Sequence, residues 1–214
     1  MKKLFWIIII LIALLFPCLY IEASPTNSTT ANKTVVYKKE SHDIDIYTKA
    51  ETEYSILISE LDTVKNDELR DWFLCYKDLI SKYSFAIDRP EVIYDYYSPE
   101  EITLMERCIE TEGYQADFAS KVNIACVILN RINSEDFQDS VYGVITAENQ
   151  FAYGRTEISS DSKLALEFAF EIRDTTDGCI AFHSNRKGEF FNNWEYVFTD
   201  AVGHNFYREV INVN

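Results

Sequence analysis

The chain has 214 residues, of which 47% are hydrophobic and 14% aromatic, and its formal net charge is -15. This length can bury the core of one catalytic domain and leaves residues for a tail or a small accessory segment. Nucleic acids and anionic lipids are bound mainly through Lys and Arg contacts to phosphate. The acidic balance therefore excludes nucleic acid as an expected partner.

Residues 1–24 have the features of an export signal or a membrane anchor. Two lysines precede the apolar run 4–16, and small residues follow at Ala23 and Ser24. A spanning helix needs roughly 20 apolar residues, so a cleaved signal is expected first and a retained anchor through residues 4–21 second. Either alternative predicts an exported chain that is extracellular or associated with the cell wall, and its oligomeric state stays open.

Residues 25–97 are predicted to form two segments before the main domain. Residues 25–44 are small and polar, which is typical of a flexible tether. Residues 45–97 are predicted to be a helical accessory segment, because apolar side chains recur at helical spacing, as at Trp72, Phe73 and Tyr76. Their apolar faces need a partner, which is the downstream domain, each other, or another chain.

Residues 98–214 are predicted to form the main domain, and its first helix carries several acids. Ser98 and Glu101 make a capping box at its start, and Gly113 indicates its end. Glu112 shares a helix face with Met105, Cys108 and Ile109, which predicts that Glu112 points inward and Glu110 faces solvent. Burial of a carboxyl group favours its protonated form, which a general acid needs. Glu110→Gln is accordingly expected to leave activity nearly unchanged.

The rest of the domain is predicted to contain more helices and then a small sheet. A helix that begins at Asp117 or Ser120 is apolar nearly all round from 122 to 129, which predicts a core helix. Residues 160–173 fit another amphipathic helix, and 179–183 and 204–210 fit strands, with Trp194 in the loop between them. Helices followed by strands indicate an α+β domain.

Several motifs occur together between about residues 99 and 208. Glu112 is followed at a fixed spacing by Val-Ile-Leu-Asn130-Arg131, and further pieces lie at 141–144, 149–151, 178–182 and 203–207. This combination resembles the SleB-type cell-wall hydrolase family. The resemblance implies a lysozyme-like fold, cleavage of peptidoglycan glycan strands, and a family glutamate that falls on Glu112. One departure is Gly-Tyr-Gln at 113–115, where the family commonly has Ala-Arg-Gly.

Cleavage of the MurNAc-β-1,4-GlcNAc bond needs a proton donor and usually a second carboxylate. In a lytic transglycosylase the substrate's own 6-hydroxyl replaces the second group, so one glutamate suffices. No second acid matches a family position, which favours a lytic transglycosylase with Glu112 as its catalytic residue. Asp117 and Glu148 remain candidates for the second acid of a hydrolytic muramidase.

Aromatic rings stack on sugars and amides bond their hydroxyl groups, which gives a set of candidate substrate contacts. For each residue singly, a place in the core or in a solvated loop is at least as well supported. The candidates are Gln150, Phe151, Tyr153, Trp194, His204 and Tyr207.

Three other functions are alternatives to this one. A zinc site of Cys179, His183 and His204 lacks ligands at suitable spacing, so neither a metal nor another cofactor is expected. A thiol peptidase that uses Cys108 or Cys126 with His204 is disfavoured, because apolar helices oppose a thiolate, and the cysteines are expected to be free core residues. The remaining alternative is a non-catalytic wall-binding or assembly protein whose N-terminal helices make the interaction.

Overall fold

The computed structural model describes residues 30–84, 86–87, 91–184 and 194–210, with side chains from residue 45 onward. The predicted signal or anchor at 1–24, and residues 25–29, lie outside these described residues. The chain divides into two compact units, Met1–Ile46 and Tyr47–Asn214. Within the described ranges, no helix has both the length and the apolar character needed to cross a membrane.

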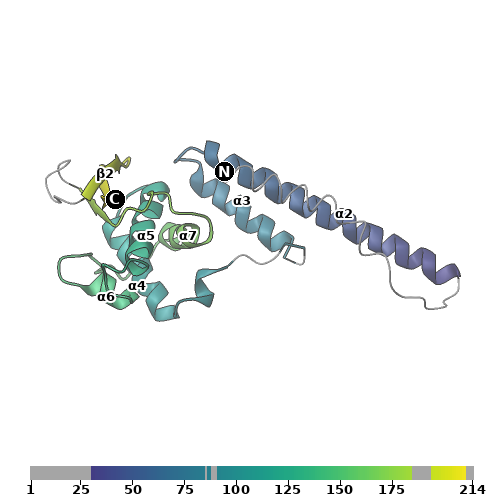
Figure 1. Cartoon of the computed structure of the whole chain (residues 1–214), viewed down its shortest axis with the longest axis horizontal. Coiled ribbons are helices and arrows are strands. Elements are labelled where there is room, and N and C mark those ends of the chain that lie inside the picture. Colours follow the sequence, from purple (N-terminus) through teal and green to yellow (C-terminus); the bar gives the residue numbers. More distant parts are fainter. Residues whose placement is uncertain (1–29, 85, 88–90, 185–193, 211–214) are drawn as a thin grey trace. The chain divides into compact units, whose positions relative to one another are not determined.

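Helix α2 (Thr30–Glu60) extends through part of both units (Figure 1). The structure is therefore helical at 30–44, where the sequence predicts a flexible tether. A helix that has formed is extended without a new nucleation cost. Residues 30–60 contain neither Gly nor Pro to interrupt such an extension. The small polar residues that suggested a tether have only a modest preference against helix, so their composition does not decide the outcome.

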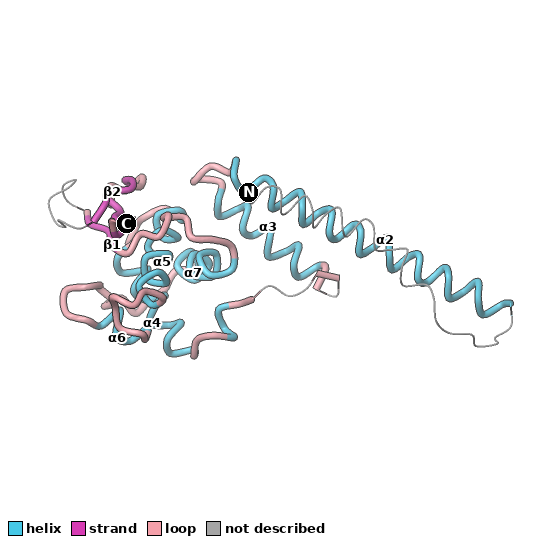
Figure 2. The backbone as a smooth tube through the Cα atoms, viewed as in Figure 1, coloured by secondary structure: helices cyan, strands magenta, loops and turns pink. Residues whose placement is uncertain are grey.

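The unit Tyr47–Asn214 is mainly helical and ends in a small antiparallel sheet, which confirms the predicted α+β class (Figure 2). Helix α5 packs most extensively on α7 and also contacts α3, α4, α6 and the first strand. The elements after α2 are η1 (Leu61–Thr63), α3 (Leu69–Lys82), η2 (Ile93–Asp95), α4 (Pro99–Glu112), α5 (Phe118–Ile132), α6 (Val141–Thr146), α7 (Ser160–Glu171), β1 (Ala181–His183), β2 (Trp194–Thr199) and β3 (Asn205–Glu209).

The two helices that carry the main motifs begin where their capping residues predict. The Ser98 Oγ accepts a hydrogen bond from the Glu101 backbone N–H at 3.3 Å, and the Glu101 carboxylate accepts one from the Ser98 N–H at 2.9 Å. This is the predicted capping box. The Asp117 side chain caps α5 through the Ser120 N–H at 2.7 Å. Helix α5 is buried along most of its length, as its all-round apolar sequence predicts.

The sheet has the strand order β1-β3-β2. Strands β1 and β3 were predicted, whereas β2 lies where a loop was expected around Trp194. The pairing of β2 with β3 shifts register between Tyr196 and Phe198, which breaks the simple alternation that reveals a strand in sequence. Phe198 stacks on Phe206 of β3 at 4.7 Å between ring centroids.

The helices of the predicted accessory segment pack into the same core as the domain that follows. The Phe73 ring packs edge-on against the Phe168 ring of α7, with 5.2 Å between centroids. Phe118 of α5 also packs edge-on against the Phe168 ring, with 6.3 Å between centroids. The Trp72 indole N–H also donates to the Leu57 carbonyl of α2 at 3.1 Å. Residues 47–97 therefore share one hydrophobic core with 98–214, and the partner of their apolar faces is the downstream domain.

Candidate functional site

Glu112 is the last residue of α4, and its carboxylate contacts the loop between α6 and α7. Its Oε1 accepts a hydrogen bond from the Ala152 backbone N–H at 2.5 Å. Burial raises the pKa of Glu112 above its usual value, while the Ala152 N–H, His204 and Arg131 oppose this rise. A raised pKa favours the protonated form of the carboxyl group, which a general acid requires.

Glu110 is buried, so the prediction that it faces solvent is wrong. Only 6% of Glu110 is exposed, and Glu106 on the same side of α4 is 7% exposed. Burial alone would raise the pKa of Glu110, but hydrogen bonds from Ser159, Ser162 and Lys121 outweigh it and lower the pKa to about 2. Helical spacing identified one apolar face correctly. It did not show that the opposite face is also covered by another part of the chain.

Arg131 lies in the last turn of α5 and organises the surroundings of Glu112, whereas the sequence gives it only as the last residue of the Val-Ile-Leu-Asn-Arg motif. It is 5% exposed. Its Nε donates to the Ile180 carbonyl at 2.5 Å, and its Nη1 donates to the Gln150 Oε1 at 2.9 Å. Its guanidinium group lies 4.4 Å from the centroid of the Phe151 ring. Burial lowers the pKa of Arg131 to about 10, and nearby Cys108 and Glu112 oppose that change.

His204 is oriented by Asp200, a residue that sequence reasoning missed. The Asp200 carboxylate accepts hydrogen bonds from the His204 backbone N–H at 2.7 Å and lies 3.0 Å from the His204 Nδ1. Its side chain is only 3% exposed. The His204 ring lies 5.4 Å from the Phe182 ring, and its positive form would attract Glu112. The sequence signal that could have indicated this pair is Asp200 four residues before His204, with Gly203 between them to form a turn. Gly203 does adopt a φ of 94° in that turn.

The structure groups some of the predicted substrate residues and separates others. Gln150 and Phe151 meet at Arg131, and His204 bears electrostatically on Glu112. Tyr153 is half-buried against the main core. Trp194 begins β2 and pairs with the end of β3.

Tyr207 is buried and packs edge-on against Tyr196. Neighbouring residues of a strand project to opposite faces, so Tyr207 points away from the face of β3 that carries Phe206. On the face of the sheet that carries Phe206, the His204 ring packs edge-on against the Phe206 ring, with 6.4 Å between ring centroids. Tyr207 and His204 therefore serve different sides of the sheet.

The two acids considered as partners of Glu112 have other environments. Asp117 is engaged as the N-cap of α5, and Glu148 is exposed in the loop after α6. Among the described groups, those that chiefly shift the pKa of Glu112 are the Ala152 N–H, His204 and Arg131, and none is a carboxylate. The local arrangement is a single acid with a backbone N–H donor, the cation Arg131 and the imidazole of His204 near it.

The four described cysteines are free; Cys108, Cys126 and Cys179 are buried as predicted, whereas Cys75 is exposed, so the prediction of a core position is wrong for Cys75. Burial raises the pKa of Cys126 to about 12 and that of Cys108 well above its usual value. A thiol held in this way is a poor nucleophile, which argues against a thiol peptidase. Within the described ranges, no three His, Cys, Asp or Glu side chains lie close enough to hold a metal ion.

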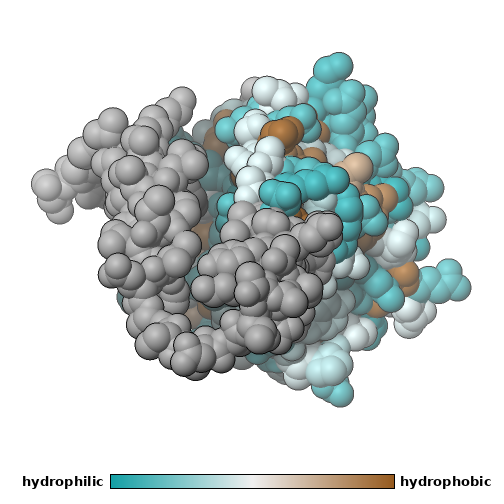
Figure 3. Space-filling model, turned by 90° about the vertical axis from the view of Figure 1, so that its right-hand side faces the viewer, coloured by the Kyte–Doolittle hydropathy of each residue, from teal (hydrophilic) through white to brown (hydrophobic). Residues whose placement is uncertain are grey.

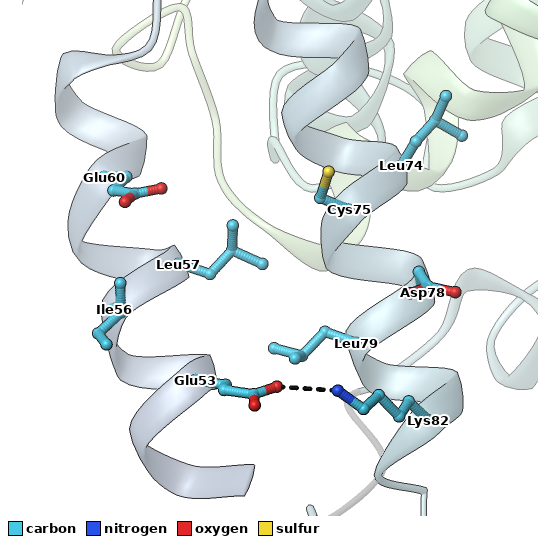
Figure 4. Close-up of a pocket in the computed structure, with 9 residues that line it drawn as sticks. All are labelled: Glu53, Ile56, Leu57, Glu60, Leu74, Cys75, Asp78, Leu79 and Lys82. Carbon is cyan, nitrogen blue, oxygen red and sulfur yellow. Dashed lines mark hydrogen bonds and ion pairs between the residues drawn. The ribbon is translucent and has the colours of Figure 1, made fainter. Parts of the chain in front are cut away.

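A groove of about 570 Å³ lies between α2 and α3, within the segment 53–82 and apart from the residues around Glu112 (Figure 4). Leu57 and Leu79 point into it, and the pair Glu53–Lys82 spans one end at 3.1 Å. The described surface in Figure 3 is mostly hydrophilic with scattered hydrophobic residues. None of the predicted catalytic or sugar-binding residues lines this groove.

One protein-family model matches a segment in the second half of the chain. Residues 115–207 match the protein-family model described as Cell Wall Hydrolase. The match begins three residues after Glu112, so this residue is assigned by motif spacing and by its environment. A search of curated proteins gives no significant match.

Two solved structures are similar to about half of the chain. One is the catalytic domain of the SleB protein of Bacillus cereus, with 23% identity over 51% of this chain and 91% of that chain, and a TM-score of 0.47. The other is the catalytic domain of the germination-specific lytic transglycosylase SleB of Bacillus anthracis, with 22% identity over 52% and 97%, and a TM-score of 0.48. The family-model match over residues 115–207 confirms the predicted resemblance to cell-wall hydrolases.

Proposed function

We propose that the protein is an exported enzyme that degrades peptidoglycan by cleaving the MurNAc-β-1,4-GlcNAc bond as a lytic transglycosylase. The observation that carries this proposal is the carboxyl group of Glu112. It has a raised pKa, lies three residues before a segment that matches cell wall hydrolases, and is near the Ala152 N–H, Arg131 and His204. A single acid in this setting suits a reaction in which the sugar itself supplies the second group.

In the proposed reaction, protonated Glu112 gives its proton to the glycosidic oxygen as the bond to the MurNAc anomeric carbon breaks. The positive charge that develops on the sugar ring is then quenched by the 6-hydroxyl of the same MurNAc. Glu112, now a carboxylate, accepts the proton of that hydroxyl. The products are a chain with a 1,6-anhydro end and a chain with a free 4-hydroxyl, and the enzyme returns to its starting protonation state.

The surroundings of Glu112 suit both halves of this cycle. Burial favours the protonated acid that starts the reaction, while the Ala152 N–H stabilises the carboxylate that forms after the first step. Gln150 accepts a hydrogen bond from Arg131 through its Oε1, which leaves its NH2 group to donate to a sugar hydroxyl or acetamido oxygen. Phe151 and His204 offer ring faces for stacking against a sugar.

The test is incubation of the purified protein with cell-wall sacculi, followed by mass spectrometry of the released fragments. We expect anhydro-ended fragments from the native protein and none from Glu112→Gln. Glu157→Gln is the matched control, because it removes an exposed acid from the loop that contacts Glu112 and is expected to keep activity. Equal activity of Glu112→Gln and the native protein would refute the assignment.

Other outcomes select other functions. Fragments with reducing ends would identify a hydrolytic muramidase, and a second carboxylate would then have to act with Glu112. Sacculi that bind the protein but stay intact would favour a non-catalytic wall-binding protein. Export is checked separately by fractionating cells and locating the chain with an antibody. Recovery from the cytoplasm alone would refute that part of the proposal.

A further inference from the structure

A buried ionic cluster joins α4, α5 and the start of α7, and it consists of Glu110, Lys121, Ser159 and Ser162. The Glu110 Oε2 lies 3.2 Å from the Lys121 Nζ and accepts hydrogen bonds from the Ser159 Oγ at 2.5 Å and the Ser162 Oγ at 2.7 Å. The Ser159 backbone N–H donates to the same oxygen at 3.1 Å. The Lys121 Nζ in turn contacts both serine hydroxyls, at 2.9 and 3.1 Å.

The cluster is closely packed, and its lysine ammonium group and both serine hydroxyls are hydrogen-bonded within it. Lys121 is 5% exposed and Ser162 is fully buried. A Cβ on Gly113 would lie 3.0 Å from the Lys121 Cγ and 2.9 Å from the Ile109 carbonyl oxygen, so a glycine is needed where the Lys121 stem passes the end of α4. A buried charge pair persists only with such complete partners, because removal of one partner strands the other charge in the core.

A serine next to a lysine also suggests a nucleophile and its base, but this cluster does not suit that chemistry. The lysine of such a pair must be free to accept the serine proton, whereas Lys121 is paired with the carboxylate of Glu110. The low pKa of Glu110 keeps that carboxylate charged at neutral pH. Ser162 is also closed to solvent, so no substrate reaches it.

The cluster holds one end of the loop that contacts Glu112. Residues 151–159 have no helix or strand of their own, so side-chain contacts fix their path. Three consecutive residues of α4 bind this loop. Glu110 holds Ser159, Thr111 accepts from the Arg155 N–H at 3.1 Å, and Glu112 accepts from the Ala152 N–H at 2.5 Å. The Arg107 Nε adds a bond to the Arg155 carbonyl at 2.9 Å.

We propose that Glu110 is a positioning residue for Glu112: it anchors the Ser159 end of the loop and so fixes the Ala152 N–H against the catalytic carboxylate. This inference rests on the proposed function of Glu112. In Glu110→Gln the side chain no longer carries the charge that pairs with Lys121. The new NH2 group is a donor placed among the donors of Lys121, Ser159 and Ser162. The loop is then released at Ser159, and Glu112 loses a donor that stabilises its charged form.

The experiment compares Glu110→Gln with the native chain in the sacculus assay over a range of pH. Loss of the Ala152 donor raises the pKa of Glu112, while Arg131 on α5, His204 before β3 and Cys108 on α4 remain around it. We expect a rate at neutral pH that is lower by about tenfold to a hundredfold, the scale of a misplaced catalytic group. The limb of the pH profile that reports loss of the Glu112 proton should shift to higher pH.

Glu157→Gln is the matched control, because it removes an exposed acid from the same loop and is expected to keep the native rate and profile. Ser159→Ala covers the case in which Glu110→Gln does not fold. It keeps the ion pair, removes one hydroxyl donor, and should shift the pH limb in the same direction by less.

Amide hydrogen exchange separates positioning from general destabilisation and does not depend on catalysis. In Glu110→Gln we expect faster exchange at residues 152–159 and unchanged exchange in the centre of α5. If residues 152–159 of Glu110→Gln exchanged their amide hydrogens at the rate of the native protein, the proposal would be overturned. This holds even if the native protein proved not to cleave glycan at all. A lower rate with an unshifted pH limb would overturn it as well, since that pattern indicates only a structural role.

Discussion

The acid sensitivity of folding should trace in part to Glu110, whose pKa is about 2 in the folded protein against an ordinary value of 4.5. A group with a lowered folded pKa stabilises the protein above its unfolded pKa, and this contribution is lost as pH falls towards the folded value. At about 1.4 kcal/mol per unit of pKa, the difference corresponds to roughly 3 kcal/mol at neutral pH. By the same linkage, about 2 kcal/mol of this should be lost between about pH 6 and pH 3.

The assay is urea unfolding followed by tryptophan fluorescence at several pH values, on the native chain and on Glu110→Gln. Trp72 lies in the core, so its emission reports unfolding. Asp174 and Asp200 also have lowered pKa values, so both proteins should lose stability in acid. The Glu110 contribution is the difference in the free energy of unfolding between the native chain and Glu110→Gln. This difference should become smaller as pH falls. Two curves that stay parallel from pH 6 to pH 3 would refute the assigned pKa.

Four further outcomes are expected. Gln115 has a φ of 62° on the exposed turn after α4, so Gln115→Gly should raise the free energy of unfolding by about 1 kcal/mol in urea titrations. Phe73→Ala should lower it by about 3 to 5 kcal/mol, because Phe73 is fully buried. Asp200→Asn should reduce glycan cleavage about tenfold while the circular dichroism spectrum stays native, because His204 loses its orienting carboxylate. A thiol reagent should label Cys75 rapidly in the native state and leave Cys126 unmodified until urea is added, as mass spectrometry can show.

Local chemistry accounts for most of what could be predicted from the sequence. The capping box at Ser98 and Glu101, the all-round apolar pattern of α5, and the strands near 181 and 205 depend on neighbours within a few residues. Each is decided by the chain's own hydrogen bonds and by its apolar spacing. The position of Glu112 at the end of α4 follows from the same helix boundaries.

The surroundings of Glu112 could not be predicted in this way, because they depend on residues far apart in the chain. Glu110 is buried by Ser159 and Ser162, which lie 49 and 52 positions away. Helical spacing shows which residues share a face, but it cannot show that a second layer covers the polar face. The place of Arg131 also depends on a distant carbonyl, that of Ile180.

The shared core of α3, α5 and α7 limits how residues 98–214 can be moved into other proteins. A chain that began at Ser98 would leave Phe168 and Phe118 without the Phe73 ring that packs near them. Residues 98–214 are therefore not a portable module. A fusion protein that is to carry this domain in soluble form should begin near Tyr47, where the compact unit begins.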